Sequence, residues 1–358
     1  MWYPFKSAFR AGNVGSTQWD DVNIGSNSVA MGSDVTAKGF SSLATGLGST
    51  APGNWSTAMG FYPNASGAAA VALGYAAHAS GDYSTAMGYY SSTTATGSSA
   101  IGYQDTSGGL GSVAMGYQSV ATGQGSVALG YQSSATGSGS AALGYRAIAT
   151  GGGLAFGSTV STDVYSGSVI IGDGIQFSSP TTSSDNNQMT MRFIGGYRLF
   201  TSINLSTGVT LSASGSSWST VSDSTKKEHF ERAEGEDFLQ SVSRLRLGSW
   251  NYKGQDVEHF RHYGPMAQEI FHYFGKDRLG TIGNDTTLAS ADMDGIMMIC
   301  LQALEKRTAE LKQAQEQLQK NQGEIAELKE SFKHMQETIA RLDQGSREKS
   351  AKLSDSSP

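Results

Sequence analysis

Glycine recurs every 14 residues through the first half of the chain, and this period limits the possible folds more than any other feature. Each glycine closes a short word such as SVAMG or SVALG. A second series runs seven residues ahead of most of these positions, and Gly97 breaks it. A disordered Gly/Ser linker has no reason to keep such a phase, so the period predicts stacked, nearly identical units. The main series comprises Gly32, Gly46, Gly60, Gly74, Gly88, Gly102, Gly116, Gly130 and Gly144.

Each half of the repeat reads as a short strand followed by a turn. Glycine suits the turns because it adopts positive φ without a Cβ clash. Alternation along the strand places Val113 and Met115 on one face and Ser112 and Ala114 on the other. Two halves make one 14-residue coil. Residues 26–160 are therefore predicted to form a narrow parallel β-solenoid in which only neighbouring coils touch.

The predicted solenoid carries very little charge. Between Ser26 and Val160 the sequence has five charged residues. A monomer with so neutral a surface would be unusual. We therefore expect one face of the coil to be buried against other copies of the chain. The charged residues are Asp34, Lys38, Asp82, Asp105 and Arg146.

The words SVAMGYQSVATGQG and SVALGYQSSATGSG resemble the head repeats of trimeric autotransporter adhesins. The resemblance covers roughly residues 26–160 and implies a left-handed parallel β-roll that trimerises. Adhesins of that family end in a membrane β-barrel anchor, whereas this chain ends in REKSAKLSDSSP. We therefore do not expect attachment to an outer membrane by that route.

The N-terminal segment 1–25 is a poor match to a signal peptide, because it lacks a long apolar stretch and a small-residue cleavage site. The sequence leaves the location open between a virion tail fibre and an extracellular or cell surface. A cell-surface receptor or glycan is a conceivable partner of such a fibre, and nothing in the sequence identifies it.

The segment 161–221 is predicted to be a β-rich stem without chemistry of its own. Met189, Met191 and Phe193 alternate with polar residues, as in a half-buried strand. Gly195-Gly196 reads as a turn into the next strand, YRLFTSI. We therefore expect a hairpin at this glycine pair.

The composition changes at the stretch SDSTKKEHF, where Ser222 and Lys227 lie five residues apart. A serine hydroxyl needs a base to become a nucleophile, and a lysine can serve if desolvation lowers its pKa. Ser-Lys pairs are a known variant of the catalytic triad. Spacing alone favours the plainer interpretation, a solvated Ser and Lys in a polar segment.

A second resemblance favours catalysis. The series SDSTKKEHF, WNYKG, HYGPMAQE, DMDG and LQALEKR, spanning roughly residues 222–307, resembles the C-terminal intramolecular chaperone of endosialidase tail spikes. That self-cleaving domain also occurs in other phage tail fibres and in the myelin regulatory factor family. The resemblance implies a chaperone that trimerises, guides folding of the upstream fibre and then cuts itself off. Carried over by position, Ser222 is the nucleophile, Lys227 its base and Ser222–Asp223 the scissile bond, with Val221–Ser222 as the competing choice.

Further residues match the family's His-x-Gly-x-x-Ala-Gln segment. They are His262, Gly264, Ala267 and Gln268. They either support the site directly or act structurally, as a turn and a helix start. The family usually has Asn two residues after the lysine, and this chain has His229. Cleavage could therefore be slowed or lost while folding assistance survives.

Neither a metal, a cofactor nor a nucleic acid is expected. The single cysteine, Cys300, excludes an intrachain disulfide framework and a CxxC metal site. His259, His262 and His272 lack the spacing of a common zinc site. The net charge of −6 leaves no basic surface for nucleic acid, and no apolar run is long enough for a transmembrane helix. A DNA-binding or membrane-tethered relative of the myelin factor type is accordingly disfavoured.

Residues 304–345 have a heptad pattern that predicts a coiled coil, followed by a disordered tail at 346–358. The alternative is one amphipathic helix packed on its own domain. The a positions are Leu304, Leu311, Leu318, Ile325, Phe332 and Ile339, and the d positions are Arg307, Ala314, Asn321, Leu328, Met335 and Leu342.

Taken together, these patterns predict a mainly β chain with an α-helical C-terminus: a β-solenoid head, a β stem, an α+β chaperone at 222–303 and a coiled coil. We expect a homotrimer that acts as an adhesin-like fibre. Its chaperone is either released by autoproteolysis, a single-turnover Ser-Lys peptidase reaction, or retained without an enzymatic step.

Overall fold

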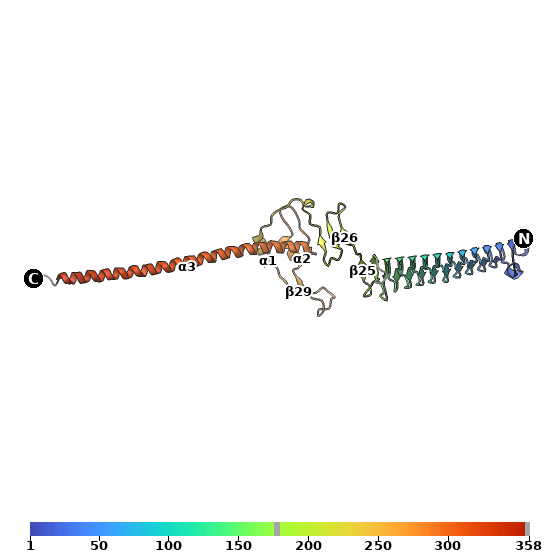
Figure 1. Ribbon diagram of the computed structural model, residues 1–358, viewed down its shortest axis with the longest axis horizontal. Helices are drawn as coiled ribbons and strands as arrows, with labels where there is room; N and C mark the ends of the chain where they lie inside the picture. Colours follow the sequence, from blue (N-terminus) through green and yellow to red (C-terminus); the bar gives the residue numbers. More distant parts are fainter. Residues whose placement is uncertain (175–179, 355–358) are drawn as a thin grey trace. The chain divides into compact units, whose positions relative to one another are not determined.

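The computed structural model describes residues 1–174 and 180–354 (Figure 1). The chain divides into two compact units, Met1–Val221 and Ser222–Pro358. Each unit is built differently: the first from short strands and the second from helices around a small core.

The N-terminal unit is a parallel β-solenoid, drawn in Figure 1 as a regular ladder of short strands. Within the described residues, one sheet has 14 strands in the order β1-β2-β3-β5-β7-β9-β11-β13-β15-β17-β19-β21-β23-β25. Its strands are β1 (Trp2–Tyr3), β2 (Ala8–Asn13), β3 (Val29–Ser33), β5 (Leu43–Leu47), β7 (Thr57–Phe61), β9 (Val71–Tyr75), β11 (Thr85–Tyr89), β13 (Ser99–Tyr103), β15 (Val113–Tyr117), β17 (Val127–Tyr131), β19 (Ala141–Tyr145), β21 (Leu154–Ser158), β23 (Val169–Gly172) and β25 (Met189–Arg192).

The opposite side of each coil forms a second sheet, with 11 strands among the described residues. These strands are two residues long because the turns take up the rest of each coil. They are β4 (Thr36–Ala37), β6 (Thr50–Ala51), β8 (Asn64–Ala65), β10 (His78–Ala79), β12 (Ser92–Thr93), β14 (Thr106–Ser107), β16 (Val120–Ala121), β18 (Ser134–Ala135), β20 (Ile148–Ala149), β22 (Val160–Ser161) and β24 (Thr181–Thr182).

The register confirms the predicted coil. Ala114 pairs in parallel with Ala128, and Gly116 with Gly130, each one period further along the chain. Stacking so tight leaves no room for a side chain at the main glycine series. A Cβ added to Gly116, whose φ is +137°, would lie 2.0 Å from the carbonyl oxygen of Gly130. Glycine therefore recurs every 14 residues because the backbones of neighbouring coils pack directly against each other at this position.

The interior of the coil is filled by small side chains. Ser112 and Ala114 are fully buried, whereas Val113 and Met115 point outward, with Val113 partly buried and Met115 41% exposed. Alanine and serine fill most of the core between the two sheets, and the largest buried side chains, Arg10 and Ile170, lie in the coils at its two ends. The buried serines satisfy their hydroxyls on turn carbonyls, as when Ser112 Oγ donates to Gly109 O at 2.7 Å.

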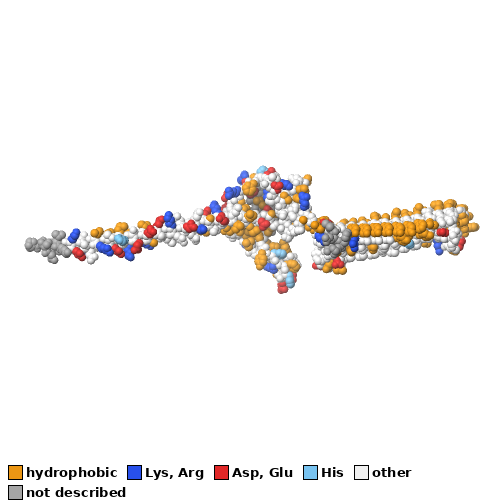
Figure 2. Space-filling view, viewed as in Figure 1, with side chains coloured by type: hydrophobic (Ala, Val, Ile, Leu, Met, Phe, Trp, Pro, Cys, Tyr) orange, Lys and Arg blue, Asp and Glu red, His pale blue; other side chains and the backbone are white. Residues whose placement is uncertain are grey.

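The large apolar side chains consequently lie on the outside (Figure 2). A row of aromatic rings runs along the ends of the strands of the 14-stranded sheet. Consecutive centroids are 4.7–4.9 Å apart, close to the spacing between strands. The rings are those of Phe61, Tyr75, Tyr89, Tyr103, Tyr117, Tyr131 and Tyr145.

The solenoid extends past both expected bounds. At the N-terminus, β2 pairs in parallel with β3, and β1 covers the edge of the sheet as an antiparallel strand. Three short 3₁₀ turns complete this end: η1 (Pro4–Lys6), η2 (Thr17–Trp19) and η3 (Asp21–Asn23). At the other end, β23, β24 and β25 continue the ladder into the segment expected to be the stem.

The hairpin predicted at Gly195-Gly196 is wrong. β25, which contains Met189 and Met191, pairs in parallel with β23 as the last strand of the solenoid. The hairpin lies one strand later, between β26 (Gly196–Phe200) and β27 (Gly208–Ser212), and β28 (Ser219–Thr220) completes this small antiparallel sheet. The alternation of residues 189–193 is common to a hairpin strand and a solenoid strand, so it could not tell them apart.

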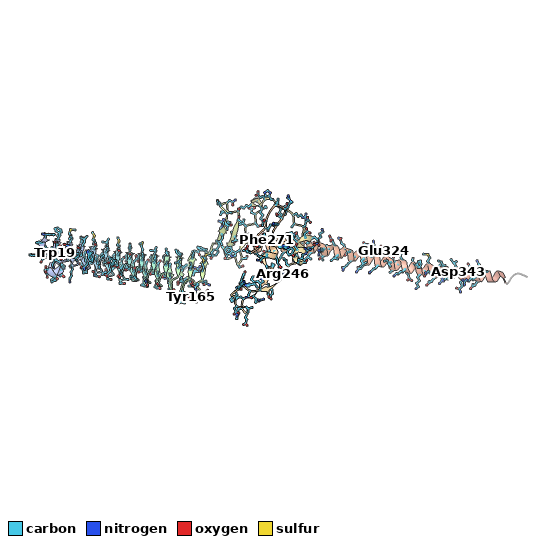
Figure 3. All side chains as sticks on the ribbon, turned by 180° about the vertical axis from the view of Figure 1, so that it is seen from behind. Trp19, Tyr165, Arg246, Phe271, Glu324 and Asp343 are labelled. Atoms are coloured by element: carbon cyan, nitrogen blue, oxygen red, sulfur yellow. The ribbon has the colours of Figure 1, made fainter. Side chains whose placement is uncertain are left out.

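The C-terminal unit begins with the 3₁₀ turn η4 (Ser224–Lys226) and contains α1 (Gly235–Ser243), β29 (Gly248–Trp250), β30 (His262–Gly264), α2 (Ala267–Phe274) and α3 (Ser290–Ser354). Its core is small. Phe274, Ile296 and Cys300 are buried, and partly buried side chains from α1 and α2 pack around them. Arg246 and Phe271 mark this unit in Figure 3.

α3 is one continuous helix that takes in all of residues 304–345 and continues through the tail expected to be disordered, as far as Ser354. Residues 355–358 lie outside the described residues. From Leu304 to Leu342, the apolar side chains at a and d positions are exposed in the single chain. Glu324 and Asp343 mark this part of the helix in Figure 3. Within the described ranges, every helix is too short or too polar to span a bilayer.

Candidate functional site

The first residues of the C-terminal unit fold back on themselves and bring Ser222 and Lys227 together. The Nζ atom of Lys227 donates a hydrogen bond of 2.8 Å to Ser222 Oγ. The turn responsible is η4, the single 3₁₀ turn between them, which ends where Lys227 begins an extended segment. A 3₁₀ turn advances only about 2 Å per residue, so five positions along the chain become direct contact.

Asp223 holds this turn in place. Its carboxylate accepts hydrogen bonds from the backbone N–H of Thr225 at 2.9 Å and from the Thr225 hydroxyl at 2.8 Å. Asp223 is thus the N-cap of η4, a position that acidic side chains favour. These bonds, led by the one from the Thr225 backbone, lower the pKa of the Asp223 carboxyl. The sequence had assigned Asp223 only to the scissile bond, and its Asp-x-Thr spacing was the missed signal for the cap.

Ser222 and Lys227 are both exposed in the single chain. The contact pairs the two atoms that a Ser-Lys dyad requires. A lysine acts as a base only when it is neutral, because an ammonium donates protons and cannot accept one. The single chain does not bury the lysine, which is what would favour its neutral form.

His229 occupies a left-handed backbone position, with φ of 56°. Among residues other than glycine, this conformation is adopted most readily by Asn, Asp and His. The asparagine usual in the resembling family and the histidine found here therefore meet the same backbone requirement. His229 also lies 3.8 Å from Glu228 through its Nε2 atom.

The other candidate residues lie on β30 and at the start of α2. His262 on β30 pairs with Trp250 on β29, and their rings are 4.8 Å apart. Gly264 ends β30 with a φ of +149°, a conformation that L side chains rarely adopt. Ala267 and Gln268 open α2. In the described chain, no hydrogen bond or ion pair joins this group to Ser222 or Lys227.

His262 is also marked by an unsatisfied atom. Its Nε2 is buried, and within the described part of the chain it has no hydrogen-bond partner. The indole N–H of the neighbouring Trp250 is in the same condition. Unpaired buried polar atoms are uncommon in native proteins and call for an explanation such as a missing partner. These two lie side by side, because Trp250 and His262 are paired residues of adjacent strands.

Three ion pairs that the sequence did not predict tie the segments of this unit together. Glu231 pairs with Arg278, Arg246 with Glu269 on α2, and Glu236 on α1 with Arg307 on α3. Arg307 Nε donates to Glu236 Oε2 at 3.0 Å. Arg307 had been assigned to a d position of the coiled coil, and its pairing with α1 gives it a second role within one chain.

Comparisons with known families match the two units separately. The family described as "YadA head domain repeat (2 copies)" matches residues 37–62, 65–91, 80–104, 107–133 and 135–153. The family described as "Chaperone of endosialidase" matches residues 222–276, which begin at Ser222 and include β29, β30 and α2. No curated protein matches the chain.

Segments within residues 37–153 are thus similar to YadA head repeats, and residues 222–276 are similar to the chaperone of endosialidase. Both resemblances expected from the sequence are thereby confirmed. The chaperone match starts at the residue where the C-terminal compact unit starts, so the Ser-Lys contact lies at the very beginning of the matched domain.

Proposed function

We propose that three copies of this chain form an adhesin-like fibre, and that the C-terminal unit assembles the copies and then cuts the chain beside Ser222. The observation that carries the proposal is the 2.8 Å contact of Lys227 Nζ with Ser222 Oγ, located where the fibre unit ends and the chaperone-matched unit begins. A cut at this place would separate two independently compact units.

The exposed apolar surfaces support assembly. Val113 and Met115, with their equivalents in other coils, make the outer face of the 14-stranded sheet mostly apolar, with Thr45, Thr57, Thr85 and Ser99 as the polar exceptions in β5, β7, β11 and β13. Along α3, exposed apolar residues such as Leu318 and Ile325 repeat with the heptad period of a coiled coil. We therefore keep residues 304–345 as a three-stranded coiled coil. The adhesin-type heads and endosialidase-type chaperones that the sequence resembles are trimeric.

A C-terminal clamp fits the folding problem of the head. Pairings between distant coils and between copies form slowly and leave strand edges exposed meanwhile. Holding the three chains in register reduces the entropy of that search. Removing the clamp after folding would leave the fibre kinetically trapped.

The proposed chemistry begins with proton transfer. Neutral Lys227 takes the proton of Ser222 Oγ, and the oxygen attacks a carbonyl carbon. When the peptide C–N bond breaks, the lysine ammonium returns a proton to the leaving amine. Water then hydrolyses the resulting ester, which frees the carboxylate and restores the serine hydroxyl. Because Lys227 is exposed in one chain, burial by neighbouring copies is the step that would neutralise it.

Which peptide bond breaks depends on the size of the ring that forms when Ser222 Oγ attacks a carbonyl carbon, and on whether that carbonyl belongs to the same chain. Attack of Ser222 Oγ on the preceding carbonyl, of Val221, closes a five-membered ring within one chain and cuts Val221–Ser222. Attack on its own carbonyl would close a strained four-membered ring. The Ser222–Asp223 cut implied by the resemblance therefore requires the hydroxyl of another copy. Both cuts remain part of the proposal.

The second candidate is a fibre that keeps its chaperone. It is favoured by the exposure of both dyad residues and by His229 at the position where the resembling family has Asn. In that case the C-terminal unit acts in assembly alone, and no bond is broken.

A denaturing gel of the purified full chain separates the two candidates. Cleavage gives fragments 1–222 and 223–358, or 1–221 and 222–358, and intact mass spectrometry distinguishes the cuts by one serine residue. Ser222→Ala should give one full-length band. So should Lys227→Arg, because a guanidinium keeps the positive charge but cannot act as a base. A full-length wild-type band under folding conditions leaves only the uncleaved fibre.

A further inference from the structure

From β3 to β21, both ends of each strand in the 14-stranded sheet are marked by a corner residue in the left-handed conformation. One corner lies before the strand and the other directly follows it, seven positions later. For β11 the two corners are Tyr83, with φ of 56°, and Tyr90, with φ of 54°. The corners before the strands form one edge of the sheet, and those after the strands form the other edge.

The residues at the two edges change together along the fibre. The two strands with an aromatic corner residue at one end, β7 and β11, also have an aromatic corner residue at the other end, and β5 and β9 have small residues at both ends. In the later coils, glycine at the first edge accompanies glutamine or arginine at the second. From β5 to β19 the pairs are Ser41 with Gly48, Trp55 with Tyr62, Ala69 with Ala76, Tyr83 with Tyr90, Gly97 with Gln104, Gly111 with Gln118, Gly125 with Gln132, and Gly139 with Arg146.

The two members of a pair cannot contact each other within one chain. A strand advances about 3.3 Å per residue, so corners on either side of it lie about 20 Å apart. The four aromatic corners are also well exposed. The exposed fraction is 59% for Trp55, 54% for Tyr62, 71% for Tyr83 and 48% for Tyr90. The presence of aromatic residues at both ends of β7 and β11 therefore does not come from a contact between the two corners of one strand within a single copy.

The aromatic corners also carry a conformational cost. Bulky side chains rarely adopt the left-handed conformation, and glycine adopts it freely. The chain uses glycine at the equivalent corner in Gly97, Gly111, Gly125 and Gly139. Strained residues persist where the surrounding structure or a function retains them. Within one chain, Trp55 packs edge-on against Phe40 at 6.0 Å, and Tyr62 and Tyr90 lie 4.7 Å from the neighbouring rings of the aromatic row. Each of the four corner residues still keeps 48–71% of its surface exposed, which leaves room for a further contact.

We propose that the two edges meet across copies, so that the corner before each strand packs against the corner after the same strand in the next copy. This inference rests on the proposed trimer. When three identical sheets surround a threefold axis, the first edge of one copy faces the second edge of its neighbour at the same height. Trp55 then meets Tyr62 of the next copy, and Tyr83 meets Tyr90 of the next copy.

The size pattern fits such contacts. Neighbouring coils are about 4.8 Å apart along the fibre axis, and packed aromatic rings prefer centroids about 4.5–7 Å apart. Two rings packed across copies therefore occupy more height than a single coil provides. The small pair Ala69 and Ala76 leaves that room between the two aromatic levels. Gly48 is the corner residue one coil before Tyr62, and a Cβ added to it would lie 2.3 Å from the Tyr62 ring. The corner residue of that coil must therefore be small as well. The aromatic corners would act as a lock that fixes the axial register of the three heads.

Cysteine crosslinking of the full chain tests the contact. Tyr83→Cys combined with Tyr90→Cys, treated with a short bis-maleimide, should give covalent dimers and trimers on a denaturing gel. Each single variant should stay at monomer size. The matched control joins Tyr90→Cys with Gly139→Cys, whose corner has open space but lies four coils away, about 19 Å along the axis. The control should not crosslink.

Light scattering of the same samples separates this inference from the proposed function. A trimer that does not crosslink, or that crosslinks as well in the control, overturns the edge contact and leaves the fibre proposal standing. A monomer overturns the proposed trimer as well.

A double-mutant cycle gives a second readout. Tyr83→Gly and Tyr90→Gln reproduce the pair found in the coils that follow, so both should fold. If the two residues touch across copies, the shift in Tm of the double variant will differ clearly from the sum of the single shifts. Strictly additive shifts overturn the contact, because residues so far apart within one chain are expected to be independent.

Discussion

Gly116→Ala tests whether the glycine period records backbone packing. The new Cβ would lie 2.0 Å from the carbonyl oxygen of Gly130, and the φ of +137° is one that L side chains rarely adopt. An unusual backbone conformation costs about 1–3 kcal/mol, and overpacking costs about 1–3 kcal/mol more. The expected loss is therefore about 2–6 kcal/mol in each chain. For a unit of this size it lowers Tm by about 5–20 °C.

Gly125→Ala is the matched control, because it makes the same substitution in the next coil. Its φ of +63° is also positive, but an added Cβ there meets nothing within 4 Å. Only the left-handed conformation is penalised, at about 1 kcal/mol, so Tm should fall by about 2–4 °C. Thermal unfolding followed by circular dichroism at one scan rate compares the two variants fairly. Equal shifts would refute the backbone-packing argument.

Two further predictions concern the buried carboxyl of the head and the terminal helix. Burial raises the pKa of Asp105, so its contribution to stability is fully present below the ordinary aspartate pKa and is lost as pH rises through the raised value. Serine occupies the equivalent positions 91 and 119, so Asp105→Ser should fold. It should raise Tm at neutral pH and make Tm less dependent on pH, and an unchanged profile of Tm against pH would contradict this. Deleting residues 304–345 should abolish trimers during folding, and sedimentation that still finds trimers would remove the clamp argument.

The Ser-Lys contact was within reach of the sequence because it is local. Ser222 and Lys227 are joined by one turn, and the capping pattern of Asp223 with Thr225 dictates that turn. The resemblance identified His262, Gly264 and Gln268 as candidate site residues. It did not show where these residues lie in the fold or that no hydrogen bond or ion pair joins them to Ser222 or Lys227 in the described chain. Their neighbours come from the pairing of β29 with β30 and from the start of α2, which no local spacing encodes.

The sequence by itself determined the coil, because a period of 14 with glycine in fixed phase is compatible with little else than stacked backbone turns. It also determined the direction of the alternating side chains. Only the tertiary structure decided which face is the interior. Ala114 and Ser112 fill it while Met115 and Tyr117 stay outside, because the narrow space between the two sheets of this coil holds small side chains. The structure also placed β25 in the solenoid, since strand partners depend on which edge is free and not on alternation.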